Sequence, residues 1–389
     1  MTSRIKGFFA ILRRELVDLV KDRDIMILVL IAPVFYSIFY STIYLNKTEF
    51  EIPVAVFDRD ESTLSRQYLS DLNAHQLIEV KGHTTDISEA ENLLKKEVVQ
   101  GVVIIPEDFE KSLKSGRHVS VKVLLNTHRF LHSNDINKAV NEIGFAWTEQ
   151  IRMKTFNLKG IPTHQARELV EPVKEEIRFM FNPMLTYGDF LIPGVLILIL
   201  QQTLLLGLAQ SIAKERQEGR LAVWFENGHH STSAAITGKT IIYFLLFVVY
   251  SFFFITFHYW FFDIPSYAPL FQTLILTTVF IFINISFTVL IASFFTNKPG
   301  VLQVIAFTSY PFFFLTGFAW PELSFPPLMV WLGDLLPIKP FLSAFIKTFR
   351  MGGDLGLIIP ELNHLFILGV VYTLLAYFRM RWVFKHSDH

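Results

Sequence analysis

The fold is decided by residues 25–45, which read IMILVLIAPVFYSIFYSTIYL and contain no charged side chain. A helix needs about 20 such residues to cross the roughly 30 Å hydrocarbon layer of a membrane. Residues 46–189, which follow, have the mixed polar and charged composition of a soluble domain, and further apolar stretches begin only at Phe190. One apolar span, a long insertion and then more spans predict a membrane protein that carries one folded domain outside the bilayer.

Composition supports this interpretation. The chain has 389 residues, of which 51% are hydrophobic and 40 are Phe, far from the balance of a typical globular protein. Its 35 basic and 35 acidic residues give no net positive charge that would attract nucleic acid, so we expect no nucleic-acid partner. The absence of Cys excludes disulfides, thiolate metal sites and cysteine nucleophiles.

The apolar stretches predict an all-α membrane protein with six transmembrane helices. We expect them at about 25–45, 190–213, 240–262, 270–295, 299–320 and 362–381, with residues 382–389 as a tail. A competing seventh span within 323–346 is disfavoured, because four prolines, Asp334 and Lys339 divide that segment into pieces too short to cross a bilayer. Residues 321–350 are therefore expected to form broken interfacial or re-entrant helices on the outer side.

The Lys and Arg residues of the short loops and tails set the orientation, because such residues concentrate on the cytoplasmic side. The opposite short loops contain only Lys339, Lys347 and Arg350. The cytoplasmic set is Arg4, Lys6, Arg13, Arg14, Lys21, Arg23, Lys214, Arg216, Arg220, Lys239, Lys298, Arg379, Arg381 and Lys385. We therefore expect a multi-pass protein of the bacterial inner membrane with both termini in the cytoplasm and residues 46–189 outside.

Residues 1–24 precede the first span and are expected to form a cytoplasmic amphipathic helix. Apolar residues recur at helical spacing between charged ones, which is typical of a helix that lies in the membrane interface; they are Ile5, Phe8, Phe9, Leu12, Leu16, Leu19 and Val20. Such a helix could also meet a cytoplasmic partner. The simpler alternative is a basic flank that only fixes the topology.

The insertion alternates short β-branched runs with polar helical stretches, which predicts a small extracytoplasmic α/β domain. Asp86 or Ser88 is placed to cap its second helix, and Pro106 marks the start of the third. Long amphipathic helices are expected over 133–157 and, after a break at Gly160-Ile161-Pro162, over 163–179. These helices could relay motion between the domain and the spans or only pack the domain in place. The expected strands lie at 52–57, 77–80, 101–105 and 119–125, and the shorter helices at 62–72, 87–96 and 107–113.

Motifs for catalysis or metal binding are nearly absent. His229 and His230 are adjacent, so they would not share a helical face, and we expect no metal there. Gly238-Lys239-Thr240 resembles the end of a phosphate-binding loop, but Ser233 stands where that motif needs its first glycine. An intramembrane enzyme would need ionisable groups within the spans, where His258 and His364 are the only candidates, each near a span end. We therefore expect no catalytic residue and no cofactor bound by this chain.

One cytoplasmic loop stands out. It follows the second span as Lys214-Glu215-Arg216-Gln217-Glu218-Gly219-Arg220, with Gly238-Lys239 before the third span. A dense mixed-charge turn closed by glycine can pair with a soluble partner or can be a solvated membrane flank.

This loop resembles the signature loop of ABC type-2 transporter permeases, in particular the subgroup with a large extracytoplasmic domain between spans one and two. The similarity extends along the chain in matching order, through IPVAVFDRD at 52–60, GVVIIP at 101–106 and GFAWP at 317–321 followed by Pro326-Pro327.

The resemblance implies the permease of an ATP-driven exporter, or efflux system, for a hydrophobic or amphipathic substrate. Two permeases, identical or related, would pair and dock two separate ATPase subunits, which would bind ATP-Mg. Spans two and five would line the dimer interface and the pathway, with Gln201 and Gln202 as candidates for that interior, although a helix-to-helix hydrogen bond would explain them equally well. The residues that would couple to the ATPase are Arg13, Arg14, Lys214, Glu215, Arg216, Glu218, Gly219, Gly238 and Lys239.

The chain departs from the family pattern after Gly219, where Arg220-Leu221-Ala222 and Asn227-Gly228 replace the usual Thr-x-Glu and Thr-Pro. This departure favours pairing with a second, non-identical permease. A periplasmic adaptor is a further candidate partner. The alternative function is a membrane sensor or scaffold whose outer domain binds a ligand or partner. A sensor would be expected to have a cytoplasmic signalling module, whereas the tail after Arg379 has about ten residues.

Overall fold

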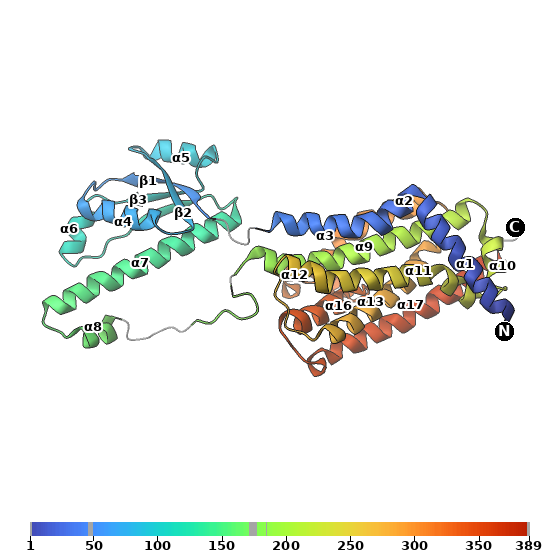
Figure 1. Cartoon of the computed structure of the whole chain (residues 1–389). Coiled ribbons are helices and arrows are strands. Elements are labelled where there is room, and N and C mark those ends of the chain that lie inside the picture. The colour runs from blue at the N-terminus through green and yellow to red at the C-terminus, as the bar shows by residue number, and fades with distance from the viewer. Residues whose placement is uncertain (1, 46–49, 171–176, 184, 387–389) are drawn as a thin grey trace. The chain divides into compact units, whose positions relative to one another are not determined.

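A computed structural model of the chain describes residues 2–45, 50–170, 177–183 and 185–386, with only the backbone for residues 2–10. The chain divides into two compact units, one formed by residues 1–47 with 179–389 and the other by residues 48–178 (Figure 1). The first unit is helical, and the second contains a small sheet. Each unit has its own hydrophobic core.

The helical unit is built from long helices interrupted by short 3-10 and π segments, which are labelled η. In chain order they are α1 (Thr2–Lys21), α2 (Arg23–Met26), η1 (Ile27–Ile31), α3 (Ala32–Ile43), α9 (Tyr187–Gln217), α10 (Leu221–Asn227), α11 (Thr232–Phe253), η2 (Phe254–His258), α12 (Tyr259–Phe261), α13 (Leu270–Ala292), α14 (Lys298–Phe314), η3 (Glu322–Ser324), α15 (Pro327–Asp334), α16 (Ile338–Phe345), η4 (Ile346–Arg350), η5 (Leu355–Ile358) and α17 (Ile359–Lys385).

Within the described residues, five helical segments are long and apolar enough to cross a membrane: Arg23–Ile43, Tyr187–Gln217, Thr232–Phe261, Leu270–Ala292 and Leu355–Lys385. A sixth exists only if α15 and the helix Ile338–Arg350 count as one span, and these two are bent by 85°. Prolines begin both halves of this bent pair, which agrees with the expected broken helices. The multi-pass architecture is thus clear, while the count of six spans remains a prediction.

The expected span 299–320 is shorter than the sequence suggested. Its helix, α14, has 17 residues and ends at Phe314, about 26 Å of helix at 1.5 Å per residue. Pro311 lies inside its last turn, and Gly317 adopts a left-handed φ of 78°. The chain therefore turns soon after Phe314, because a left-handed residue ends a helix and glycine adopts that conformation without strain.

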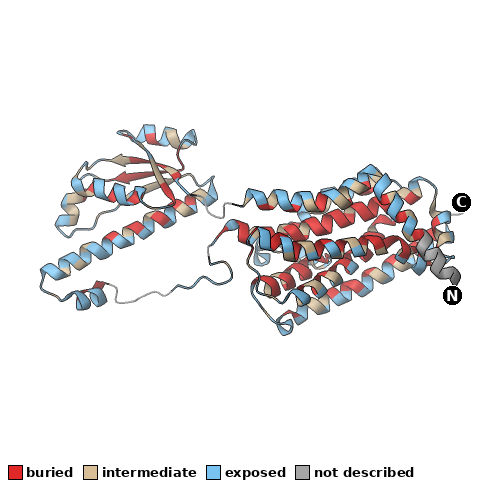
Figure 2. Ribbon diagram, viewed as in Figure 1, coloured by how far each residue is buried: buried red, intermediate tan, exposed pale blue. Residues whose placement is uncertain are grey.

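Helix α9 forms the centre of the helical unit and packs against α3, α13 and α14. It is buried along most of its length, whereas α17 presents exposed residues to the surroundings (Figure 2). Gly207 permits the closest approach, since a Cβ there would lie 2.1 Å from Cγ2 of Val29 in η1. The first span and α9 can pack this tightly only because position 207 has no side chain.

The second unit is a four-stranded sheet with strand order β2-β1-β3-β4, in which β4 alone is antiparallel. Apolar residues of α4, α6 and α7 form one core with the sheet, and α5 packs on a second cluster that includes Ala55 and Val102. The elements are β1 (Ile52–Asp58), α4 (Thr63–Asn73), β2 (Ile78–His83), α5 (Ile87–Lys95), β3 (Gly101–Ile105), α6 (Phe109–Lys114), β4 (Lys122–Leu125), α7 (Phe130–Leu158) and α8 (Thr163–Val170).

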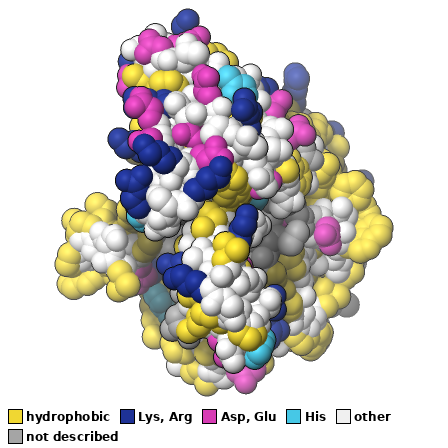
Figure 3. Space-filling model, turned by 90° about the vertical axis from the view of Figure 1, so that its left-hand side faces the viewer, with side chains coloured by type: hydrophobic (Ala, Val, Ile, Leu, Met, Phe, Trp, Pro, Cys, Tyr) yellow, Lys and Arg dark blue, Asp and Glu magenta, His cyan; other side chains and the backbone are white. Residues whose placement is uncertain are grey.

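The expected order of strands and helices in this unit is confirmed, with two shorter elements. Strand β4 begins at Lys122 rather than at residue 119. Helix α8 ends at Val170, residues 171–176 lie outside the described part, and 177–180 are not helical, so a helix reaching residue 179 was wrong. Asp86 caps α5, as the sequence allowed, by accepting a hydrogen bond from the Ser88 N–H at 3.1 Å. Acidic and basic side chains are interspersed over the visible face of this unit (Figure 3).

Candidate functional site

The candidate site is the junction of α1 with the end of α9 and the start of α11. One face of α1 is buried here by Ile11, Glu15 and Leu19, which are 2%, 2% and 4% exposed. These residues recur every four positions and so share a helical face. Leu16 and Val20, from the apolar pattern of the sequence, are instead exposed. A glutamate therefore occupies the middle of the face with which α1 packs.

Lys239 lies at the centre of this junction. Its Nζ donates to Oε1 of Glu15 at 2.7 Å and to Oε1 of Glu215 at 3.0 Å, and all three side chains are at most 2% exposed. Glu15 also accepts a hydrogen bond from Ser211 Oγ at 3.2 Å, and Glu215 pairs with Arg14 at 2.6 Å. Buried charges are tolerated only when they are paired and hydrogen-bonded. Three helices thus meet through one buried ionic cluster.

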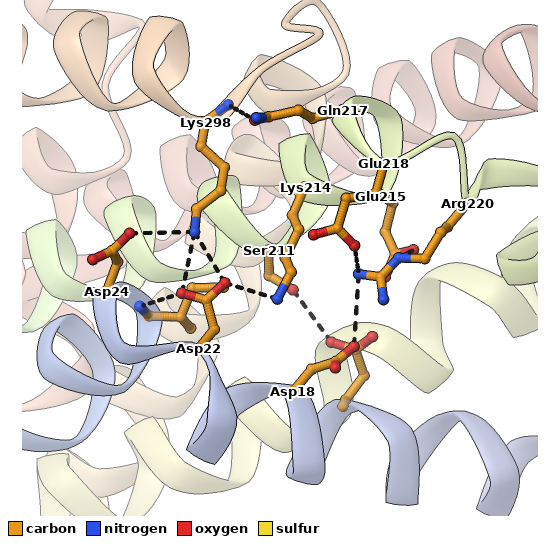
Figure 4. Close-up of polar contacts among 12 residues, drawn as sticks. Asp18, Asp22, Asp24, Ser211, Lys214, Glu215, Gln217, Glu218, Arg220 and Lys298 are labelled. Carbon is orange, nitrogen blue, oxygen red and sulfur yellow. Dashed lines mark hydrogen bonds and ion pairs between the residues drawn. The ribbon is translucent and has the colours of Figure 1, made fainter.

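A second cluster joins the end of α1 to α9 and α14 (Figure 4). Asp22 accepts from Lys214 Nζ at 2.7 Å and from Lys298 Nζ at 2.9 Å, and Lys298 also approaches Asp24 at 3.4 Å. Burial alone would raise the pKa of Asp22, but the hydrogen bonds and charges of the two lysines outweigh it and lower that pKa to about 2. Asp22 is therefore ionised throughout the neutral range.

Arg216 has a different environment from its neighbours in the loop. Its Nη1 donates to the Ser293 carbonyl at 2.7 Å and to the Phe295 carbonyl at 3.1 Å. These carbonyls lie at the end of α13, where the last turn leaves acceptors without helical donors and carries partial negative charge. Arg216 thus caps α13 from α9.

The exposed part of the loop is small. Gln217, Glu218 and Gly219 are exposed, and Gly219 ends the helical segment with a φ of 65°. Glu218 pairs with Arg220 at 2.8 Å. On α1, Arg13 is exposed while Arg14 faces the cluster. These exposed residues can contact a second protein without first breaking the cluster.

Gly238 and Lys239 lie inside α11, which begins at Thr232, and not before the span as the sequence suggested. A Cβ on Gly238 would lie 3.0 Å from Cδ1 of Ile11. Glycine at this position lets α1 approach α11 closely, which brings Glu15 within reach of Lys239.

Gln201 and Gln202 are 1% and 9% exposed within α9. Their amide atoms have no hydrogen-bond partner among the described residues, so the alternative of a helix-to-helix hydrogen bond within this chain is not supported. Buried amides without partners are unfavourable. Water, a second subunit or a transported molecule would satisfy them.

Sequence reasoning missed Glu15, Asp18 and Asp22 as partners of the loop. One oxygen from each of Glu15, Asp18 and Glu215 lies within 4.8 Å of the others, an arrangement that could hold a metal ion. Lys239 and Arg14 instead contact these carboxylates directly, so we interpret the acidic groups as counter-ions. The sequence feature that could have indicated this packed face of α1 is the four-residue spacing from Ile11 through Glu15 to Leu19.

Comparison with known proteins agrees with this architecture. The model of the ABC-2 family transporter proteins matches residues 23–378, most of the chain. The chain belongs to this family. It is 18% identical to ABC transporter G family member 20 of Dictyostelium discoideum over 330 residues, which cover 84% of the chain and 44% of that protein. Over 114 residues, 29% of each protein, it is 25% identical to the linearmycin resistance permease protein LnrN of Bacillus subtilis.

The chain is thus a multi-pass membrane protein of the ABC-2 transporter family. The chain spans less than half the length of the two relatives.

Proposed function

We propose that the chain is the permease subunit of an ATP-driven exporter of hydrophobic or amphipathic substrates. It would lie in the bacterial inner membrane with six spans, both termini in the cytoplasm and residues 46–189 outside, as in the subgroup with a large domain between spans one and two. Its match to a permease named for linearmycin resistance supports a role in efflux. A periplasmic adaptor would be an additional partner.

The observation that carries the proposal is the buried cluster of Glu15, Lys239 and Glu215. It ties α1 to the end of α9 and to α11, so that a force applied to α1 or to the exposed turn at 217–219 acts on all three helices together. Two permeases would pair and dock two ATPase subunits beneath this junction. ATP-Mg binding would close the ATPase pair, and the junction would transmit the movement to the spans.

The interior of the transporter would lie along α9, where Gln201 and Gln202 offer buried amides without partners. The spans would switch a cavity between inward or lateral access and outward release. The departure from the family pattern after Gly219 favours a partner permease that is related rather than identical.

The test reverses charge at the exposed contact residues only, with the paired variant Arg13→Glu and Glu218→Arg. Arg216 is a poor choice for this test, because it caps α13. We expect substrate-stimulated ATP hydrolysis and export by the purified complex to fall at least tenfold, with unchanged membrane insertion. The matched control is Glu168→Arg on an exposed position of α8. Unchanged coupled hydrolysis in the paired variant would contradict the docking surface.

A further inference from the structure

A cavity of about 500 Å³ opens between the bent pair α15–α16 and the start of α17. It lies at the end of the helical unit opposite the ionic junction, near the start of α17 rather than its basic last turn. Its volume is in the range of small-molecule sites. The lining combines an apolar wall with charged groups from five elements, which are η3, α15, α16, η4 and α17.

The charges that line this cavity do not balance. Glu322, Asp334 and Glu361 contribute three carboxylates, whereas Lys339 and Lys347 contribute two ammonium groups. Lys339 is shared between Glu322 at 2.8 Å and Asp334 at 2.7 Å. The cavity therefore carries one excess negative charge when its histidine is neutral.

Among the carboxylates of this cavity, Glu361 has an oxygen that can accept further hydrogen bonds. Its Oε1 accepts from Lys347 and from Ser343 Oγ at 2.9 Å, while its Oε2 is buried and has no donor among the described residues. Its side chain is 12% exposed, against 37% for Lys347. Lysine is a flexible point charge, so Lys347 can move outward and leave Glu361 to another cation. A carboxylate this enclosed gains strongly from a charged donor.

The apolar wall supplies the second half of a binding site. Phe318, Leu342, Ile346 and Met351 line the same cavity, where they can receive a hydrocarbon group. His364 lines the same cavity, and its Nε2 lies 2.8 Å from the carbonyl oxygen of Asp334.

We propose that this cavity binds amphipathic cations, with Glu361 as the counter-ion of the ligand's ammonium group and the wall around Phe318 as the contact for its apolar part. The interpretation of this ligand as a transported substrate near its release side rests on the proposed exporter function. The binding itself does not depend on that function. The site thus names a substrate class for the transporter, hydrophobic amines.

The experiment measures binding of octylamine to the purified full chain in lipid nanodiscs, by isothermal titration with empty nanodiscs subtracted. Octanol and octanoate have the same chain length without the positive charge. We expect octylamine to bind at least tenfold more tightly than either, because a charged hydrogen bond is lost in both comparisons. Equal binding of the amine and the alcohol, or preference for octanoate, would overturn the proposal.

Three variants test whether octylamine binding depends on Glu361. Glu361→Gln should weaken octylamine binding about tenfold, and Lys347→Met should strengthen it, because that change raises the excess negative charge. The control Asp354→Asn removes an exposed carboxylate outside the cavity while keeping its cap on η5. Should Glu361→Gln fail to fold, the opposite effect of Lys347→Met still decides the question. No ATPase is present, so this result is independent of the coupling test.

Discussion

Replacing Lys239 by Met should destabilise the helical unit more than any other single change at the junction. Lys239 is 1% exposed and contacts two carboxylates that are equally buried. Met preserves most of the volume but removes the charge, which leaves Glu15 with only the Ser211 hydroxyl at 3.2 Å as a partner among the described side chains. Removing one partner from a buried ion pair costs about 3–5 kcal/mol.

The size of the expected loss in stability depends on the partners that each carboxylate keeps after the substitution. Glu215 keeps Arg14 at 2.6 Å, so most of the loss falls on Glu15. The matched variant Lys214→Met leaves Asp22 paired with Lys298 at 2.9 Å. Lys214 is also 15% exposed, so its loss should cost only about 1 kcal/mol.

The assay is thermal unfolding of the purified chain in one detergent at one scan rate. The expected fall in Tm is roughly 6–10 °C for Lys239→Met and about 2 °C for Lys214→Met. A second variant, Lys239→Met with Glu15→Gln, removes the uncompensated charge and should recover at least about half of the loss.

Two results would refute this reasoning. One is a Tm of Lys239→Met equal to that of Lys214→Met, which would mean that the cluster is hydrated rather than buried. The other is further destabilisation by Glu15→Gln in the Lys239→Met background, which would mean that Glu15 has a partner of its own.

Three further predictions concern stability. The pKa of Asp22 is lowered to about 2, so the stabilisation by its charge is fully present above its unfolded pKa and is lost as the pH falls. The difference in unfolding free energy between wild type and Asp22→Asn should therefore stay constant from about pH 8 to pH 5. It should shrink only below about pH 4. Gly207→Ala should lower the unfolding free energy by about 1–3 kcal/mol in thermal unfolding, because its Cβ would lie 2.1 Å from Val29. Adding Val29→Ala should restore the stability. The control Gly144→Ala on α7, where a Cβ would have no atom within 4 Å, should be neutral or stabilising. Trp147→Phe should lower the stability of the sheet unit by about 1–2 kcal/mol, measured by denaturant unfolding, since it loses a 2.8 Å hydrogen bond to a carboxylate of α4.

Much of the fold follows from local sequence patterns. The β-branched runs predicted the strands, Asp86 was predicted as a helix cap, and the charge-free stretches predicted the long helices. These features depend on neighbours within a few residues, so periodicity and capping rules detect them. The end of α14 was misjudged, because the apolar composition continues beyond Phe314 while the turn depends on the conformation of Gly317.

The site was only partly predictable for a different reason. The loop 214–219 is conspicuous because its charges are adjacent in sequence, but Lys214 and Glu215 pair with Asp22 and Arg14, at sequence separations of 192 and 201. The apolar pattern of α1 included exposed Leu16 and Val20 and, on the packed face, only Leu19; it did not reveal that face, because Glu15 stands at its centre. Only the tertiary structure places Glu15 beside Lys239.

The ionic character of the junction has a mechanical consequence. Two apolar helix faces can slide by a turn and still bury similar area, whereas Lys239 meets Glu15 and Glu215 at hydrogen-bonding distance in only one register of α1 against α9 and α11. Buried polar groups are well known to fix register in helical assemblies, even where an apolar contact would be as stable. A joint that passes movement from a docked subunit to membrane helices needs such a fixed register, because slippage would absorb the displacement. Stability alone would not require a buried lysine here, whereas the coupling role that we propose for the junction would.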